Sequence, residues 1–278
     1  VKELRDRTSA PMMECRAALE ATGGDVEAAI KVLRERGVAK AAKRADRVTS
    51  EGLVRIGLGE DHQGGVAIMV TCETDFTARN EAFVKLADAA LEAARLAGGG
   101  VEEALAAPIS AGGTLGQLLD DTKTKIHENM ALQSVTRFEG TCGSYVHFDG
   151  KSGALVEARL GGGSGADVAP LLRDLAMHVV AAVPAPVSVD ASGIPQSLID
   201  QEREIFIKQA VDSGKPPEIA EKMVTGRMKK FTAERALLDQ PFIKDPATPV
   251  KKLVEDAAKK LGVGIEITRF ERLQVGGD

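Results

Sequence analysis

A phenylalanine beside a carboxylate stands between a β-rich run and a helical pattern, in the segment ETDFTARN at residues 73–80. One interpretation buries Phe76 in the core and makes Asp75 a helix-capping residue, because aromatic rings favour burial and short acidic side chains favour helix starts. The other interpretation presents Phe76 at the edge of the fold as an anchor for a partner's pocket. Composition alone leaves both interpretations open.

Side chains that could catalyse a reaction do not form a recognisable set. The histidines fit no HExxH pair, no serine stands in GxSxG, and the cysteines have no CxxC spacing. These histidines and cysteines are His62, His127, His147, His178, Cys15, Cys72 and Cys142. We expect His178, within a helical pattern, to be a polar or interface residue rather than a general base. The sequence therefore predicts no catalytic residue, no metal site and no cofactor.

A glycine-rich loop gives the strongest competing signal for chemistry. Residues 161–166 read GGGSGA and satisfy GxGxxA between a strand and a helix, with Asp190 farther along as a ribose-binding acid. The preceding strand, however, has the pattern of half a hairpin rather than the first strand of a parallel βαβ unit. A dinucleotide-binding enzyme that uses the loop from Gly161 to Gly165 is the alternative function.

The composition favours a protein whose partner is another protein. A chain of 278 residues suggests about two domains, and its net charge of −5 and few aromatic residues argue against a nucleic-acid-binding surface. The sequence contains no apolar stretch long enough for a membrane-spanning helix, and its first residues lack the apolar region of a secretory signal. We therefore expect a cytoplasmic protein that binds neither membrane nor nucleic acid.

The N-terminal pattern predicts a small group of helices. Three short helices are expected, at residues 2–7, 11–21 and 25–36. Gly37 closes the third helix. Met12 and Met13 point to adjacent faces of the second helix, so one is expected to pack inward while the other stays available to a partner. A basic, alanine-rich connector follows, with Lys40, Lys43, Arg44 and Arg47.

The pattern then changes to that of strands, and one order of elements occurs twice. A hairpin is followed by a helix with Phe83 and Leu86 on its apolar stripe, and the same order recurs roughly ninety residues later, about one domain length. The expected elements are strands at 53–58, 66–72, 132–138, 144–148 and 154–160 and helices at 115–129 and 166–183. Two hairpin-plus-helix units indicate a duplicated α+β core.

The last third of the chain returns to helices after the proline-rich VPAPV. Helices at 195–213 and 217–237 are separated by the breaker GKPP, and two helices joined so tightly should lie antiparallel as a hairpin. A helix at 250–261 and a strand at 265–273 follow. We expect this last strand to return to the core sheet.

Several stretches of the sequence are similar to those of one protein family. They are KELRDRTSAPMMECRAALEATGGDVEAAI at the N-terminus, CETDFTARNEAF in the core, GSYVHFDG and LAMHVVAA in the second half, and SGKPPEIAEKMVTGRMKKF with QPFIKDP near the end. In these motifs the chain resembles bacterial elongation factor Ts. Residues 98–125 depart from the family's pattern in length and composition.

The resemblance implies a fold that agrees with the pattern of elements. It is an α+β protein with an N-terminal three-helix, ubiquitin-associated-like domain, a duplicated core of β-hairpins and helices, and a helical-hairpin (coiled-coil) insertion. The implied parts are an N-terminal domain at 1–39, a basic linker at 40–51, a first core half at 52–139, a second core half at 140–194, a helical hairpin or dimerisation module at 195–238 and a C-terminal segment at 239–278 that returns to the core.

The resemblance also implies a function, that of the guanine nucleotide exchange factor of elongation factor Tu. Such a factor binds elongation factor Tu with GDP, disturbs its Mg²⁺ and phosphate site, promotes GDP release and stabilises the nucleotide-free GTPase until GTP binds. The residues that the resemblance assigns to dislocation of the partner's Mg²⁺ are Thr74, Asp75, Phe76 and Thr77. Those that it assigns to partner binding are Arg5, Met12 and Met13, near the guanine side of the GTPase domain, and His147, toward another domain.

Three further expectations come from the resemblance. The family usually has valine where this chain has Thr77, which implies a weaker apolar contact with the partner at that position. No chemical reaction and no cofactor of its own are implied for such a factor. The helical hairpin leaves a homodimer or a heterotetramer with elongation factor Tu open.

Overall fold

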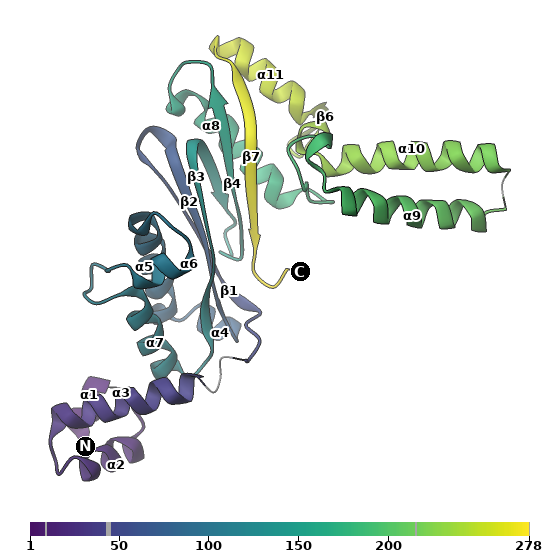
Figure 1. The fold of residues 1–278 in the computed structure, drawn as a ribbon. Coiled ribbons are helices and arrows are strands. Elements are labelled where there is room, and N and C mark those ends of the chain that lie inside the picture. Colours follow the sequence, from purple (N-terminus) through teal and green to yellow (C-terminus); the bar gives the residue numbers. More distant parts are fainter. Residues whose placement is uncertain (9, 43–45, 215, 278) are drawn as a thin grey trace.

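The computed structural model of the chain describes residues 1–8, 10–42, 46–214 and 216–277. Figure 1 shows a group of helices at the N-terminal end, a long central sheet with helices against it, and a pair of helices that projects from the other end. The α+β class expected from the sequence is confirmed. Residues 43–45 of the expected linker, with Lys43 and Arg44, lie outside the described residues.

Three helices form the N-terminal group: α1 (Lys2–Thr8), α2 (Met12–Ala21) and α3 (Val26–Ala42). Buried side chains make a small core between them, namely Leu4, Cys15, Ala18, Ala29 and Leu33. The expectation that either Met12 or Met13 packs inward is wrong: they are 58% and 72% exposed, because Cys15 and Ala18 take the inward positions of α2. The expected end of the third helix is also wrong, since α3 passes Gly37; a glycine costs a helix only about 1 kcal/mol, and alanines follow.

One antiparallel sheet joins the two expected halves of the core. Its strands, in spatial order, are β1 (Glu51–Leu58), β2 (Gln63–Cys72), β3 (Met130–Val146), β4 (Ser152–Leu160) and β7 (Ile265–Gln274). The predicted return of the last strand to the core is confirmed, because β7 pairs along β4.

The central strand β3 differs from the prediction. The strands expected at 132–138 and 144–148 form one strand of 17 residues. Its first part pairs with β2 and its last part with β4, and the change falls at Thr141. Gly143 does not break the strand; it lies where a helix packs so closely that an added Cβ would stand 2.3 Å from the Cβ of Leu172. β3 thereby merges both halves into a single sheet.

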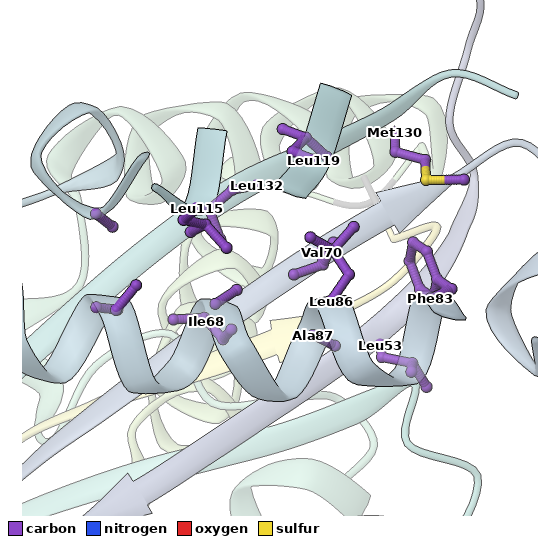
Figure 2. Packing of buried hydrophobic residues seen from close by; sticks show 14 of the residues in the cluster. Leu53, Ile68, Val70, Phe83, Leu86, Ala87, Leu115, Leu119, Met130 and Leu132 are labelled. Atoms are coloured by element: carbon purple, nitrogen blue, oxygen red, sulfur yellow. The ribbon is translucent and has the colours of Figure 1, made fainter. Parts of the chain in front are cut away.

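Helices on one face of the first half cover β1, β2 and β3. They are α5 (Glu81–Ala97), α6 (Val101–Ala106) and α7 (Leu115–Ile126). Figure 2 shows the shared core, in which the labelled side chains are Leu53, Ile68, Val70, Phe83, Leu86, Ala87, Leu115, Leu119, Met130 and Leu132. The helix expected at 115–129 ends earlier, because His127 adopts a left-handed conformation (φ 66°) that caps α7.

The second half is covered by α8 (Gly165–Ala181), with α11 (Val250–Leu261) packed beside it. In α8, the buried His178 accepts the backbone N–H of Ile243 at Nδ1 (3.2 Å), so its Nε2 donates to Gln240 (2.9 Å). Burial lowers the pKa of His178, which is therefore neutral near pH 7. His178 is thus a polar residue of the protein interior, one of the two roles expected for it.

The expected helical hairpin is present as α9 (Gln196–Asp212) and α10 (Pro217–Arg235). Buried side chains hold the two helices together, namely Ala210, Val224, Met228 and Phe231. A separate two-stranded ribbon, β5 (Pro241–Phe242) with β6 (Asp245–Pro249), connects the hairpin to α11. Short 3₁₀ turns lie at Glu60–His62, Ala191–Gly193 and Leu237–Asp239.

Candidate partner-binding site

The segment that follows β2 folds into a very short helix, α4 (Asp75–Ala78). Thr74 caps this helix, since its Oγ1 accepts the backbone N–H of Thr77 at 3.3 Å. Asn80 caps the next helix, α5, by accepting the backbone N–H of Ala82 at 2.9 Å. Threonine and asparagine are both preferred at helix N-caps, so the local sequence explains why one helix stops and another starts here.

The single turn of α4 has an outer and an inner face. Phe76 lies on the outer face and is 83% exposed, whereas Thr77 and Ala78 are each 5% exposed. Asp75 forms an ion pair with Arg79 at 3.4 Å. The structure thus excludes the interpretation of Phe76 as part of the core. Thr77 faces inward, so threonine at this position affects the packing under the turn rather than the exposed surface.

Side chains from two other segments hold α4 from below. Glu128, just after α7, accepts both the backbone N–H (3.2 Å) and the Oγ1–H (2.7 Å) of Thr74. Glu73 accepts the backbone N–H of Asn129 at 2.6 Å and pairs with Arg47 at 3.3 Å. The sequence did not identify Glu128 and Asn129 as parts of the site, because they are far from α4 along the chain. Their one local signal is the polar run HEN directly after a helix.

A second turn, between β3 and β4, lies at the same end of the sheet. It contains His147, whose Nδ1 shares a hydrogen bond with the hydroxyl of Tyr145 at 3.0 Å. Beside it, Phe148 is 92% exposed and was not among the residues identified from the sequence. Lys151 places this turn near α4, because it forms an ion pair at 2.5 Å with Glu51, the residue of β1 that stands opposite Cys72 at the end of β2. Two exposed aromatic rings therefore belong to neighbouring turns.

The other candidate residues lie on a separate part of the surface. Arg5, Met12 and Met13 belong to α1 and α2, and all three are exposed. Figure 1 shows these helices at the N-terminal extremity of the molecule, beyond α7. The group adjoins the rest of the protein where Arg34 of α3 forms an ion pair with Asp121 of α7 at 3.4 Å. The structure therefore brings His147 toward α4 but keeps the N-terminal residues apart.

The glycine-rich loop has structural partners that explain its composition. Gly165 begins α8 at a point where an added Cβ would lie 2.1 Å from the carbonyl oxygen of Asp61. Ser164 caps α8, and its hydroxyl donates to the Asp61 carboxylate at 3.0 Å, which places an acid where a dinucleotide site needs to attract phosphate. The preceding strand, β4, pairs antiparallel with both neighbours, unlike the parallel unit of a dinucleotide fold.

The remaining candidate chemistry is also accounted for by burial. Cys15, Cys72 and Cys142 are free and buried. Burial raises the pKa of Cys72 and of Cys142 to about 12, so both thiols stay protonated near neutral pH. Across the described ranges, no cluster of three or more His, Cys, Asp or Glu side chains could hold a metal ion. None of the described helices combines the length and the apolar character needed to cross a membrane.

Known proteins are similar to this chain over nearly all of its length. The family model described as Elongation factor TS matches residues 73–277, so the match begins at the residue before the α4 cap. Over 280 residues the chain is 43% identical to elongation factor Ts of Thioalkalivibrio sulfidiphilus, and the alignment covers 99% of this chain and 90% of that protein. The chain belongs to the elongation factor Ts family.

Other members of the elongation factor Ts family show a similar degree of likeness. Identity is 41% over 284 residues with the factor of Prosthecochloris aestuarii, covering 99% of this chain and 97% of that protein. It is 45% over 288 residues with the factor of Maricaulis maris, covering 99% and 90%. These alignments extend the likeness to the N-terminal helices. The chain is therefore one of the elongation factors of protein biosynthesis.

Proposed function

We propose that this member of the elongation factor Ts family is the guanine nucleotide exchange factor of elongation factor Tu. It binds the GDP-bound GTPase, disturbs its Mg²⁺ and phosphate site, promotes GDP release and stabilises the nucleotide-free form until GTP binds. The observation that carries this proposal is the 83% exposure of Phe76 on the short helix α4. A large aromatic side chain held in water on a fixed turn is suited to a partner's pocket.

In this proposal, α4 acts on the partner's Mg²⁺ through its outer face. Phe76 enters between the elements that position the ion and displaces the residues or water that hold it. Asp75 brings a negative charge into the same region. Thr74 and Thr77 act from within α4, since one caps it and the other packs beneath it.

Phe76 alone is too small a source of free energy for this task. An acceleration of GDP loss by ~10³ to 10⁵ through weaker GDP binding requires about 4 to 7 kcal/mol. Burial of one phenylalanine side chain supplies roughly 1.5 to 3 kcal/mol. By linkage, the factor must also bind the nucleotide-free GTPase more tightly than the GDP form by the same ratio. The remaining free energy must come from a wider interface.

The wider interface that we propose has two further parts. The first is the N-terminal group, on which Arg5, Met12 and Met13 are exposed and dock near the guanine side of the GTPase domain. The second is the β3–β4 turn with His147, next to which the exposed Phe148 adds apolar surface toward another domain of the partner. Separate docking points of this kind hold a distorted partner in place.

The helical hairpin is a candidate for self-association. Large apolar side chains are exposed along it and near its tip, namely Ile205, Ile207, Val211 and Ile219. We infer that the hairpin forms either a homodimer or a heterotetramer with elongation factor Tu. Light scattering of the isolated chain and of its complex gives the stoichiometry. We also propose that the protein acts in the cytoplasm, without catalysing a chemical step.

A substitution of Phe76 tests the proposed function. Phe76→Ala is expected to lower the rate of GDP release from elongation factor Tu by roughly 10- to 100-fold, the equivalent of the lost burial. Since the side chain is 83% exposed, the free energy of unfolding should change little. Stopped-flow fluorescence with labelled GDP measures the rate, and urea denaturation measures the stability.

Leu96→Ala is the matched control, because Leu96 is another exposed apolar residue, at the end of α5 and 67% exposed. It should release GDP at the wild-type rate. Wild-type stimulation by the Phe76→Ala variant would contradict the role of Phe76. No stimulation by the wild-type chain itself would contradict the proposed function, and calorimetric binding of NAD or NADP would instead favour the dinucleotide-dependent enzyme.

A further inference from the structure

Beneath α4, two chain segments that are distant in sequence are joined by hydrogen bonds in which a carboxylate of each segment accepts a backbone N–H of the other. Glu73 accepts the backbone N–H of Asn129 at 2.6 Å. In return, Glu128 accepts the backbone N–H of Thr74 at 3.2 Å and its hydroxyl at 2.7 Å. Each acidic residue thus binds the backbone amide of the residue next to the other. We call this arrangement of Glu73, Thr74, Glu128 and Asn129 the carboxylate clasp.

The clasp is enclosed and has further support. Asn129 is 8% exposed, and its side-chain amide donates to the carbonyl oxygen of Arg47 at 2.8 Å. Arg47 also pairs with Glu73, whose side chain is 19% exposed. From the other side, the thiol of Cys72 donates to the carbonyl oxygen of Thr74 at 3.3 Å. Hydrogen bonds to charged groups in such partly buried sites are stronger than those on the surface.

Glu128 also determines how Thr74 caps α4. A hydroxyl has one hydrogen to donate, and here it points to the Glu128 carboxylate. The lone pairs of Oγ1 are then free to accept the backbone N–H of Thr77 at 3.3 Å, which is the capping bond of α4. An ionised carboxylate accepts only, so Glu128 imposes this direction on the hydroxyl.

A helix as short as α4 cannot hold its own shape, because nucleation of an isolated helical turn is unfavourable. Its conformation must therefore come from tertiary contacts, and the clasp supplies those at its start. We propose that Glu128, supported by Glu73, is a positioning residue that fixes the direction in which Phe76 leaves the surface. This inference rests on the proposed exchange function, because it assigns the clasp to the delivery of Phe76 into the partner.

The clasp also connects α4 to the N-terminal group. Only His127 separates Glu128 and Asn129 from α7, the helix whose Asp121 forms an ion pair with Arg34 of α3. The same helix thus adjoins the N-terminal group and is followed by Glu128, which binds Thr74 at the start of α4. The clasp therefore relates the position of Phe76 to that of the N-terminal docking surface.

The test uses the full-length chain with Glu128→Ala and the milder Glu128→Gln. The matched control is Glu103→Ala, because Glu103 also accepts a backbone N–H at a helix start, that of Gly100 at 2.9 Å, but in α6. GDP release from elongation factor Tu is measured at increasing concentrations of each variant. This separates the maximal rate from the half-saturating concentration. Amide hydrogen exchange of residues 74–79 reports the order of α4 without a partner.

For Glu128→Ala we expect the maximal rate of GDP release to fall about 10-fold or more and hydrogen exchange at residues 74–79 to become faster. The reason is that loss of a charged hydrogen-bond partner shifts the equilibrium between the ordered and the disordered turn by roughly one order of magnitude or more. The half-saturating concentration should change little, because the other docking surfaces are intact. A general loss of folded protein would instead raise the half-saturating concentration and leave the maximal rate unchanged. Glu128→Gln keeps one acceptor oxygen, so it should fold and show a smaller effect in the same direction.

The double variant with Phe76→Ala decides whether Glu128 acts through Phe76. In that background Glu128→Ala should cause no further loss of rate. Additive losses, or wild-type rates and exchange in both Glu128 variants, would overturn the inference while leaving the exchange function in place. If the wild-type chain fails to stimulate GDP release, the proposed function fails, and hydrogen exchange alone then decides whether the clasp orders α4.

Discussion

A substitution of Glu157 on β4 should weaken the join between the two halves of the sheet. Glu157 is 8% exposed, and its carboxylate accepts two backbone N–H groups of β3, from Glu139 at 3.1 Å and from Gly140 at 2.8 Å. Toward β7 it accepts bonds from Thr268 at 2.9 Å and from Arg269 at 2.8 and 3.1 Å. One carboxylate thus binds both neighbouring strands.

The free energy that Glu157 contributes to stability follows from the pKa of its carboxylate. Burial opposes its ionisation, but the hydrogen bonds from Arg269, Gly140 and Thr268 outweigh burial and lower the pKa of Glu157 from 4.5 to about 2. At about 1.4 kcal/mol per pKa unit, this difference corresponds to about 3 kcal/mol of stability. Because the folded-state pKa lies below the unfolded-state value, this stabilisation is fully present above about pH 4.5 and is lost as the pH falls toward 2.

We therefore expect Glu157→Gln to lower the free energy of unfolding by about 3 kcal/mol at pH 7, and by about half of that at pH 3. Urea denaturation of both proteins at each pH measures the difference. The matched control is Glu266→Gln, which removes an exposed 3.0 Å pair with Arg159 between the same two strands and should cost under about 1 kcal/mol. A difference between wild type and Glu157→Gln that stays constant from pH 7 to pH 3 would refute this reasoning.

Two substitutions that involve glycine test the left-handed end of α7 and the close approach of α8 to β3. His127→Gly is expected to raise the free energy of unfolding by about 1 kcal/mol, because His127 holds a left-handed φ of 66° that glycine adopts without strain; an unchanged urea midpoint would contradict this. Gly143→Ala should lower it by about 1 to 3 kcal/mol, since its Cβ would stand 2.3 Å from the Cβ of Leu172. The control is Gly226→Ala in α10, where no atom lies within 4 Å of the added Cβ, and it should stabilise the protein by about 0.5 to 1 kcal/mol. Equal effects of Gly143→Ala and Gly226→Ala in calorimetric melting would refute the close approach of Leu172 to Gly143.

The sequence predicted those parts of the fold that depend on local periodicity. The apolar stripe of α5, with Phe83 and Leu86, follows from the helical spacing of apolar residues. The antiparallel helical hairpin follows from the helix breaker GKPP between its two helices. The continuity of β3 was not predictable. Its glycines resemble turn signals, and only the distant Leu172 explains why Gly143 is needed inside a strand.

The candidate site was predictable to a similar, partial extent. The segment around Phe76 could be found from the sequence, but whether Phe76 or Thr77 faces the core depends on the direction of one helical turn. That direction is set by Thr74 together with Glu128, 54 positions away in the chain. A pattern read along the sequence contains no information on such a pairing. The same limit applies to Phe148, whose exposure depends on how its turn leaves the sheet.

The carboxylate clasp gives a thermodynamic reason why an exchange factor should hold Phe76 rigidly. Ordering a flexible backbone costs roughly 1 to 2 kcal/mol per residue, so a disordered α4 of four residues would lose about 4 to 8 kcal/mol on binding. This loss exceeds the roughly 1.5 to 3 kcal/mol that burial of a phenylalanine returns. Insertion of Phe76 from a flexible loop would therefore weaken binding to the partner. When the ordering cost is met during folding, by Glu73 and Glu128, the burial of Phe76 remains available for the proposed distortion of the partner.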